Sequence, residues 1–198
     1  MTDLSGKVVL VTGAGKGTGR AIAQAFAAHG ASLAINDLTP VNLDQTEGHI
    51  RAAGGKVKAY IVDVTKKMPI QGLVNSVLND WGRIDILVNC AQVRPKSSLM
   101  DMDDWDWQRT LDVNLTGVFL LLQSVGRVMR RLGGGTMLMT GPHSQSGLNQ
   151  AAYAISKAAL VELGTQARLE FSEYAIHVHL IDPDEEDDMV EMALALCG

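Results

Sequence analysis

The sequence predicts an α/β protein with a parallel sheet of about six strands and helices on both faces. Short apolar runs alternate with helical stretches from one end of the chain to the other. Such runs are typical of strands that are buried on both faces, and parallel strands need crossover connections, which helices provide. We find no internal repeat and no linker, so residues 1–198 are expected to form a single domain.

The elements follow one another in regular order. The first strand, KVVLVT, is almost continuously apolar, and an alanine-rich helix follows it and is stopped by Gly30. The strands are expected at Lys7–Thr12, Ser32–Asp37, Lys56–Val62, Ile84–Asn89, Thr136–Thr140 and Ala175–Ile181. The helices are expected at Gly19–His29, Asn42–Ala53, Ile70–Trp81, Asp103–Leu132, Ala151–Ser172 and Glu185–Leu196. Ligands of such sheets bind beyond the carboxyl ends of the strands, where functional residues should therefore be sought.

The composition excludes several classes of protein. The formal net charge is −5 and no basic run occurs, which argues against a nucleic-acid-binding protein. No apolar run approaches the roughly 18 residues that span a bilayer, and the N-terminus lacks the pattern of a signal peptide. Cys90 and Cys197 are too few for a disulfide framework. These features indicate a cytoplasmic protein that binds neither membrane nor nucleic acid.

A glycine-rich segment, TGAGKGTG at residues 12–19, follows the first strand directly. Glycines at such positions allow a tight turn, close approach of the backbone to a pyrophosphate, and close contact of helix and sheet. The following helix points its N-terminal amides at the phosphates. This context between strand and helix predicts a Rossmann-like, doubly wound dinucleotide-binding fold. The expected cofactor-binding residues of the loop are Gly13, Gly15, Lys16, Gly17 and Gly19.

Asp37, at the end of the second strand, bears on the choice of cofactor. A carboxylate there would accept hydrogen bonds from the adenosine ribose hydroxyls and repel a 2′-phosphate, which favours NAD. Lys16 points the other way, because a basic residue in the glycine loop can face a 2′-phosphate, so NADP stays open. An alternative interpretation is that Asp37 only opens the turn before Thr39-Pro40.

TGAGKGTG together with YAISK at residues 153–157 resembles the short-chain dehydrogenase/reductase family, and the likeness runs over nearly the whole chain. VDVT around Asp63 and VNLTG around Asn114 add to it. The resemblance implies an active site of Tyr153, Lys157 and a serine, completed by Asn114, which would hold a water of the proton relay. It also implies cofactor contacts beyond the glycine loop at Asp63, Asn89, Ala91, Tyr153 and Lys157.

The chemistry of the tyrosine–lysine pair follows from its spacing. Tyr153 and Lys157 lie one turn apart on the same face of a helix. An ammonium beside a phenol stabilises the phenolate and lowers the tyrosine pKa from about 10 toward neutrality. Such a tyrosine exchanges a proton with an alcohol or carbonyl while hydride moves to or from NAD(P). Lys157 would also bind the nicotinamide ribose. The expected reaction interconverts a small-molecule alcohol and a ketone or aldehyde.

The serine of the family has no unambiguous counterpart. Its Ser-x-x-Gly turn selects Ser144, followed by Gly147, which is our first choice. Counting back from Tyr153 gives Thr140, our second choice, whereas counting from the strand start gives Pro142, which has no hydroxyl. His143 is a further hydrogen-bond donor nearby. These polar residues are equally well interpreted as turn formers.

Other departures affect the substrate side. Gln92 stands where the family has the glycine of Asn-Asn-Ala-Gly, and Cys90 replaces its second asparagine. The substrate-binding segment expected after the sixth strand is reduced to Pro183-Asp184 before an acidic helix, and the seventh strand is lacking. We therefore expect a shortened member of the family. A catalytically weak nucleotide-binding or scaffold protein is the alternative, and a truncated chain whose partner completes the site is a third possibility.

Two further expectations concern assembly and metals. In the resemblance, the helix Asp103–Leu132 and the helix that carries Tyr153 meet their counterparts across a subunit interface, which predicts a homodimer or homotetramer. His177 and His179 alternate on the last expected strand and could share one face. No third ligand is evident, so no metal site is expected.

Overall fold

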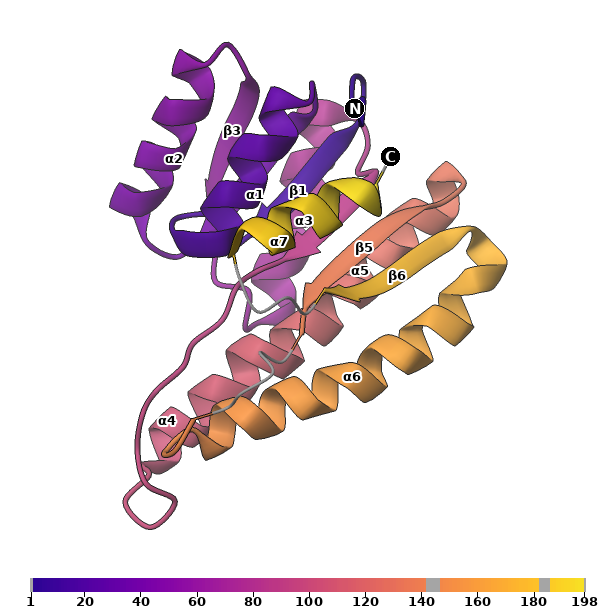
Figure 1. Ribbon diagram of the computed structural model, residues 1–198. Helices are drawn as coiled ribbons and strands as arrows, with labels where there is room; N and C mark the ends of the chain where they lie inside the picture. Colours follow the sequence, from indigo (N-terminus) through magenta and orange to yellow (C-terminus); the bar gives the residue numbers. More distant parts are fainter. Residues whose placement is uncertain (1, 142–146, 182–185, 198) are drawn as a thin grey trace.

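The computed structural model describes residues 2–141, 147–181 and 186–197. Its strands form one parallel sheet in the order β3-β2-β1-β4-β5-β6 (Figure 1). The order reverses between β1 and β4, and this is the position at which doubly wound sheets bind ligands. The strands are β1 (Val8–Thr12), β2 (Ser32–Asp37), β3 (Lys56–Ile61), β4 (Ile86–Asn89), β5 (Gly135–Thr140) and β6 (Ile176–Ile181).

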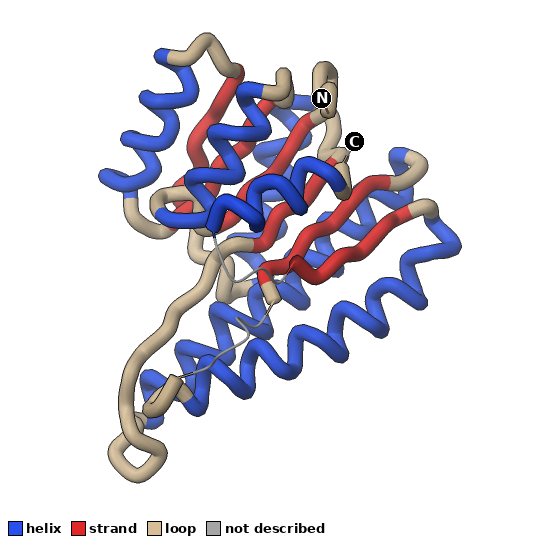
Figure 2. Tube along the Cα trace, in the orientation of Figure 1, coloured by secondary structure: helices blue, strands red, loops and turns tan. Residues whose placement is uncertain are grey.

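Helices separate all consecutive strands, as the alternating pattern predicts (Figure 2). They are α1 (Gly17–Ala28), α2 (Pro40–Ala52), α3 (Lys67–Trp81), α4 (Asp104–Leu111), α5 (Gly117–Leu132), α6 (Ala151–Phe171) and α7 (Glu186–Ala195). Apart from the stretch that holds α4 and α5, each expected helix is found, with ends shifted by at most a few residues. No helix in the described part of the chain is long and apolar enough to cross a membrane.

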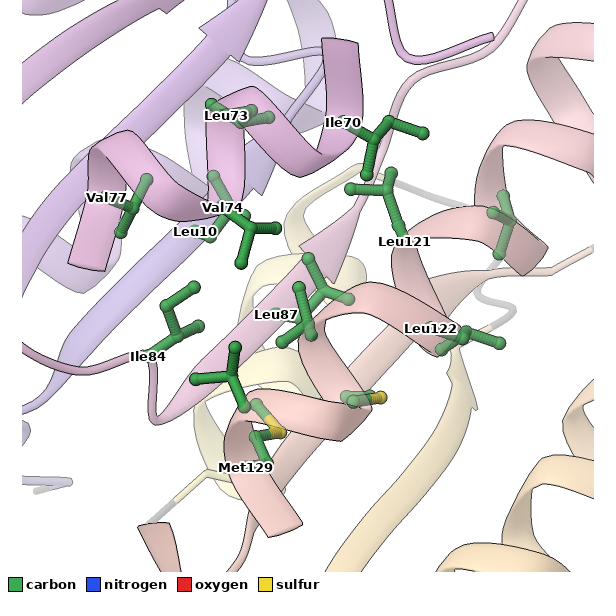
Figure 3. Close-up of a cluster of buried hydrophobic side chains, with 14 of the residues drawn as sticks. Leu10, Ile70, Leu73, Val74, Val77, Ile84, Leu87, Leu121, Leu122 and Met129 are labelled. Carbon is green, nitrogen blue, oxygen red and sulfur yellow. The ribbon is translucent and has the colours of Figure 1, made fainter. Parts of the chain in front are cut away.

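Strand residues alternate between two hydrophobic cores, one on each face of the sheet. In β1, Val8 and Leu10 belong to the core beneath α3, α5 and α6, whereas Val9 and Val11 belong to the core beneath α1, α2 and α7. Both faces of a strand are therefore buried, which explains its continuous apolar run. Figure 3 shows the first core, where Leu10 and Leu87 of the sheet lie among leucines and valines of α3 and α5.

The expected helix Asp103–Leu132 is interrupted, which corrects the prediction from the sequence. A π-helical segment, Asp112–Thr116, separates α4 from α5. Immediately after it, a Cβ on Gly117 would lie 2.5 Å from the carbonyl oxygen of Val64, so only glycine permits this contact with the chain after β3. Such π segments often mark functional sites. Here the segment carries Asn114, one of the expected active-site residues.

The chain reaches α7 from β6 through only four residues, 182–185. Pro183 and Asp184 thus lie outside the described residues. Met189 and Ala193 bury α7 in the core shared with α1. In the described part of the chain β6 pairs only with β5.

Burial lowers the pKa of His179 on β6. The described residues contain no group of three His, Cys, Asp or Glu side chains that could bind a metal.

Candidate active site

The glycine loop is packed on one side and open on the other. A Cβ on Gly13 would lie 2.6 Å from the amide nitrogen of Ala91, and one on Gly19 would collide with the carbonyl oxygen of Gly13. Gly17, by contrast, has a φ of +53° and no atom within 4 Å of its Cβ direction. The backbone is therefore exposed where a pyrophosphate would approach the N-terminus of α1. These residues fit a dinucleotide.

Asp37 supports the loop in addition to facing the nucleotide cleft. Its Oδ2 accepts a hydrogen bond from the Gly15 amide at 2.9 Å, and its Oδ1 accepts one from the Thr39 amide at 3.0 Å. The second bond is the turn-opening role weighed from the sequence. Arg20, which sequence reasoning missed, donates to the Gly15 carbonyl and, at 3.0 Å, to the hydroxyl of Thr46. An arginine in the first turn after a glycine loop is the only signal that could have indicated it.

A cleft of about 410 Å³ runs from the glycine loop past the ends of β2, β3 and β4. We call it the nucleotide cleft. Its lining includes most of the expected cofactor residues, namely Gly13, Lys16, Gly17, Gly19, Asp37, Asp63 and Ala91. Asp63 accepts a hydrogen bond from the Thr65 amide at 2.9 Å. Asn89 lies behind the wall, and its buried amide group has no hydrogen-bond partner among the described residues. Gly15 does not line the cleft, but its amide donates a hydrogen bond to Asp37, which does.

Tyr153 and Lys157 are brought together on α6, as their spacing predicts. Both are buried, with 2% and 1% of their surfaces exposed, and the Lys157 ammonium lies 5.6 Å from the centre of the Tyr153 ring. Lys157 Nζ donates to the backbone carbonyl of Thr140 at 2.7 Å and to its hydroxyl at 3.2 Å. The end of β5 therefore fixes the ammonium beside the tyrosine.

Of the two hydroxyl candidates for the serine position, only Thr140 is described. Its hydroxyl donates to the carbonyl oxygen of Asn89 at 3.2 Å and accepts from Lys157. The side chain is buried between β4, β5 and α6, so its interactions are with the protein interior. Ser144, our first choice, lies outside the described residues, as do Pro142 and His143.

Asn114 joins the π segment to the chain that follows β4. Its Oδ1 accepts from the Val93 amide at 2.8 Å, and its Nδ2 donates to the Val93 carbonyl at 2.9 Å. Nδ2 also donates to the hydroxyl of Ser156 at 3.1 Å, one residue before Lys157. The side chain thus positions the loop and α6 relative to each other.

A second cavity of about 550 Å³ adjoins the nucleotide cleft, and we call it the outer cavity. The Tyr153 side chain lies in its wall, and Gln92 borders both spaces. The tyrosine hydroxyl donates to Gln92 Oε1 at 3.3 Å. The side chain that replaces the family glycine therefore reaches the expected reaction centre.

Sequence reasoning missed Arg94, which faces the tyrosine ring. Its guanidinium lies 4.7 Å from the ring centre of Tyr153, and its Nε and Nη2 donate to Gln150 Oε1 at 3.0 and 2.7 Å. The loop that carries Arg94 passes beside the start of α6, where the Ser97 amide donates to the Asn149 carbonyl at 3.0 Å. An arginine two residues after Gln92 gave no pattern that pointed to this contact.

Cys90 packs in the core at the junction of sheet and glycine loop. Burial raises the pKa of its thiol to about 12, although the charge of Lys157 acts in the opposite direction. The thiol therefore stays protonated near neutral pH and is a poor nucleophile. This agrees with its interpretation as a packed small residue.

The comparisons with known proteins agree with this geometry. The model of the short chain dehydrogenase family matches residues 7–191. D-threitol dehydrogenase of Mycolicibacterium smegmatis is 35% identical over 182 residues, which cover 91% of this chain and 70% of that protein. A structure of NAD⁺-bound xylitol dehydrogenase has a TM-score of 0.87 and 35% identity, and covers 91% of this chain and 70% of that one.

A further match covers more of both chains. A metagenomic short-chain oxidoreductase in complex with NADP has a TM-score of 0.92 and 31% identity, and the match covers 98% of this chain and 91% of that one. The fold, the glycine loop and the Tyr153–Lys157 pair are therefore found together in a chain that resembles known dehydrogenases throughout. The chain belongs to the short-chain dehydrogenase family and is an NAD(P)-dependent oxidoreductase that interconverts an alcohol and a ketone or aldehyde.

Proposed function

We propose that Tyr153 is the general acid and base of this reaction and that Lys157 holds it in a reactive state. The observation that carries the proposal is the buried ammonium of Lys157, which the Thr140 carbonyl holds 5.6 Å from the centre of the Tyr153 ring in the wall of the outer cavity. When bound, the nicotinamide supplies or accepts the hydride. Tyr153 then gives a proton to the carbonyl oxygen or takes one from the alcohol.

Asn114 and a hydroxyl group complete the proposed site. Because the Asn114 amide already bonds to Val93 and Ser156, the relay water would be held by the main chain of the π segment. Ser144 is the proposed donor to the substrate oxygen, with Thr140 and His143 as the alternatives. The hydroxyl of Thr140 is engaged with Asn89 and Lys157, which favours Ser144.

NAD is the proposed physiological cofactor. The carboxylate of Asp37 borders the nucleotide cleft and is held by the Gly15 and Thr39 amides, so it lies in a fixed place. A fixed negative charge there disfavours the 2′-phosphate of NADP. Lys16 borders the same cleft and is the group through which NADP would bind.

The proposal extends to the domain organisation, the assembly and the location of the protein. Residues 1–198 would form a single domain acting as a homodimer or homotetramer in the cytoplasm, where cysteines remain reduced. A groove of about 280 Å³ between α5 and α6, beside Phe119 with 45% of its surface exposed, supports an interface at these helices.

A second candidate function is nucleotide binding without catalysis. It is favoured by the hydrogen bond from the Tyr153 hydroxyl to Gln92, because Gln92 occupies a position from which a substrate oxygen would approach. In that case the chain would bind NADH and turn over no carbonyl compound.

Oxidation of NADH with a panel of ketones and aldehydes separates the two functions. In Tyr153→Phe, which keeps the ring but removes the proton, kcat/KM should fall by about 10²-fold or more, with NADH affinity preserved. Tyr174→Phe serves as the matched control and should retain activity, because Tyr174 lines neither cavity. Bound NADH with no turnover in the unaltered protein, or equal turnover in Tyr153→Phe, would overturn the catalytic proposal.

A further inference from the structure

The outer cavity is positively charged although the chain as a whole is acidic. Its lining contains three cations, Lys16, Arg94 and Arg109, against one carboxylate, Asp106. The whole chain has a formal net charge of −5. None of the three cations forms an ion pair with any residue in the described part of the chain. A concave site with uncompensated positive charge attracts and binds anions.

Two of these cations are shared with the cofactor site. Lys16 and Arg109 border the nucleotide cleft as well as the outer cavity, so their charge also acts on the phosphates of a dinucleotide. Arg94 borders the outer cavity alone. The phosphates of a dinucleotide in the cleft would therefore neutralise Lys16 and Arg109 but not Arg94.

The orientation of Arg94 is fixed by neutral groups. Its Nε and Nη2 both donate to the amide oxygen of Gln150, which in turn accepts from the Gly147 amide at 3.1 Å. The guanidinium carbon lies over the Tyr153 ring, 4.7 Å from its centre. Nη1 donates to no acceptor among the described residues, so the edge formed by Nη1 and Nη2 is the one left for a ligand. That edge matches the two oxygens of a carboxylate.

We infer that the substrate carries a carboxylate group and that Arg94 binds it next to Tyr153. The inference rests on the proposed function, since it identifies the substrate class of the same site. Because Arg94 lies over the ring of the proposed proton donor, the reacting carbonyl would be only a few bonds from the acid. The substrate class is therefore a short oxo acid, or the corresponding hydroxy acid in the reverse direction.

Binding of matched acid and amide probes tests the inference without requiring turnover. The protein is saturated with NAD⁺ and titrated by calorimetry with pyruvate and pyruvamide, 3-oxobutanoate and 3-oxobutanamide, and 4-oxopentanoate and 4-oxopentanamide. For at least one pair we expect the acid to bind about tenfold more tightly than the amide. Higher salt should reduce this preference because the Arg94 side chain is exposed to solvent.

Two arginine variants locate the effect. Arg94→Gln should remove the preference for the acid over the amide, and Arg94→Lys should retain only part of it because an ammonium lacks the fork of donors. Arg131→Gln is the matched control and should retain the full preference, because Arg131 is exposed near the end of α5 and lines neither cavity nor the groove between α5 and α6.

The outcomes distinguish this inference from the proposed function. Equal affinity for acid and amide in every pair, including the absence of binding by both, overturns the inference, as does a preference that persists in Arg94→Gln. Reduction of neutral ketones by NADH would leave the proposed function intact in that case. Conversely, an Arg94-dependent acid preference without turnover of any carbonyl compound would contradict the catalytic proposal alone.

Discussion

The nucleotide cleft and the outer cavity share a border but are built from different parts of the chain. The cleft is formed largely by backbone: glycines with little space around them, amides held by Asp37, and the N-terminus of α1. The outer cavity is formed by long side chains, among them Gln92, Arg94 and Arg109. One space is therefore fixed by the fold and the other by the identity of a few residues.

This difference separates cofactor binding, which depends on the path of the backbone, from substrate selection, which depends on side chains. A backbone site can change only if the chain path changes, so it binds the same kind of group wherever the path is kept. A side-chain site changes with single substitutions, and fold alone does not determine what it binds. Substitutions in the cleft should thus affect folding and cofactor together, whereas substitutions in the outer cavity should affect substrates.

Gly13→Ala should show the largest effect and tests whether the cleft is fixed by backbone packing. Gly13 has a φ of +66°, and its Cβ would lie 2.6 Å from the Ala91 amide nitrogen. We expect a loss of about 2–4 kcal/mol in the free energy of unfolding from strain and overpacking. In a chain of this size the melting temperature should fall by roughly 5–15 °C, measured by calorimetry.

Gly72→Ala provides the control for that experiment. Gly72 lies on α3 with no atom within 4 Å of its Cβ direction, so alanine should stabilise the helix by about 0.5–1 kcal/mol. A Gly13→Ala protein as stable as the parent would mean that the loop adapts readily, and the contrast between the two spaces would then be lost.

The cleft could be predicted from the sequence because the residues that form it lie in short contiguous segments at the ends of strands. A glycine loop directly after a buried strand, followed by Asp37 at the end of the next strand, indicates both the turn and the ligand. The parallel sheet was equally predictable, since β1 is buried at every position and is apolar at every position except its last, Thr12. Tyr153 and Lys157 were predictable as neighbours because a helix places residues four apart on one face.

The outer cavity could not be predicted because its contacts join distant segments. Arg94 meets Tyr153 only because the loop after β4 passes beside the start of α6, a path that no local pattern encodes. The π segment is a similar case, since helical periodicity continues through Asp103–Leu132, whereas the close approach of Gly117 to Val64 directly after the π segment joins residues far apart in the sequence. The serine position remains a prediction, because Thr140 follows from gapless counting back from Tyr153, whereas Ser144 requires a shorter segment before Tyr153 than the family has.

Asp37→Asn tests whether a side chain in the cleft determines the choice between NAD and NADP, and we expect an effect of intermediate size. It removes the negative charge that disfavours a 2′-phosphate, so the ratio of kcat/KM for NADH over NADPH should fall by about tenfold. The ratio is the proper measure, because weaker hydrogen bonds to the Gly15 and Thr39 amides would affect both cofactors alike. Asp63→Asn, in the same cleft, should leave the ratio unchanged. An unchanged ratio in Asp37→Asn would remove the basis for NAD preference.

Gln92→Gly tests whether Gln92, which borders both spaces, hinders the substrate at Tyr153, and it should have the smallest effect. The 3.3 Å hydrogen bond from the Tyr153 hydroxyl to Gln92 Oε1 must break before a substrate oxygen can take its place, which costs about 1 kcal/mol. Removing the side chain should therefore raise kcat/KM for carbonyl reduction by roughly two- to fivefold. Gln92→Ala should give most of this gain without added backbone freedom. Gln71→Ala should give none, because Gln71 lies on α3 and lines neither cavity. A fall in kcat/KM for both Gln92 variants would contradict this expectation and identify Gln92 as a substrate ligand.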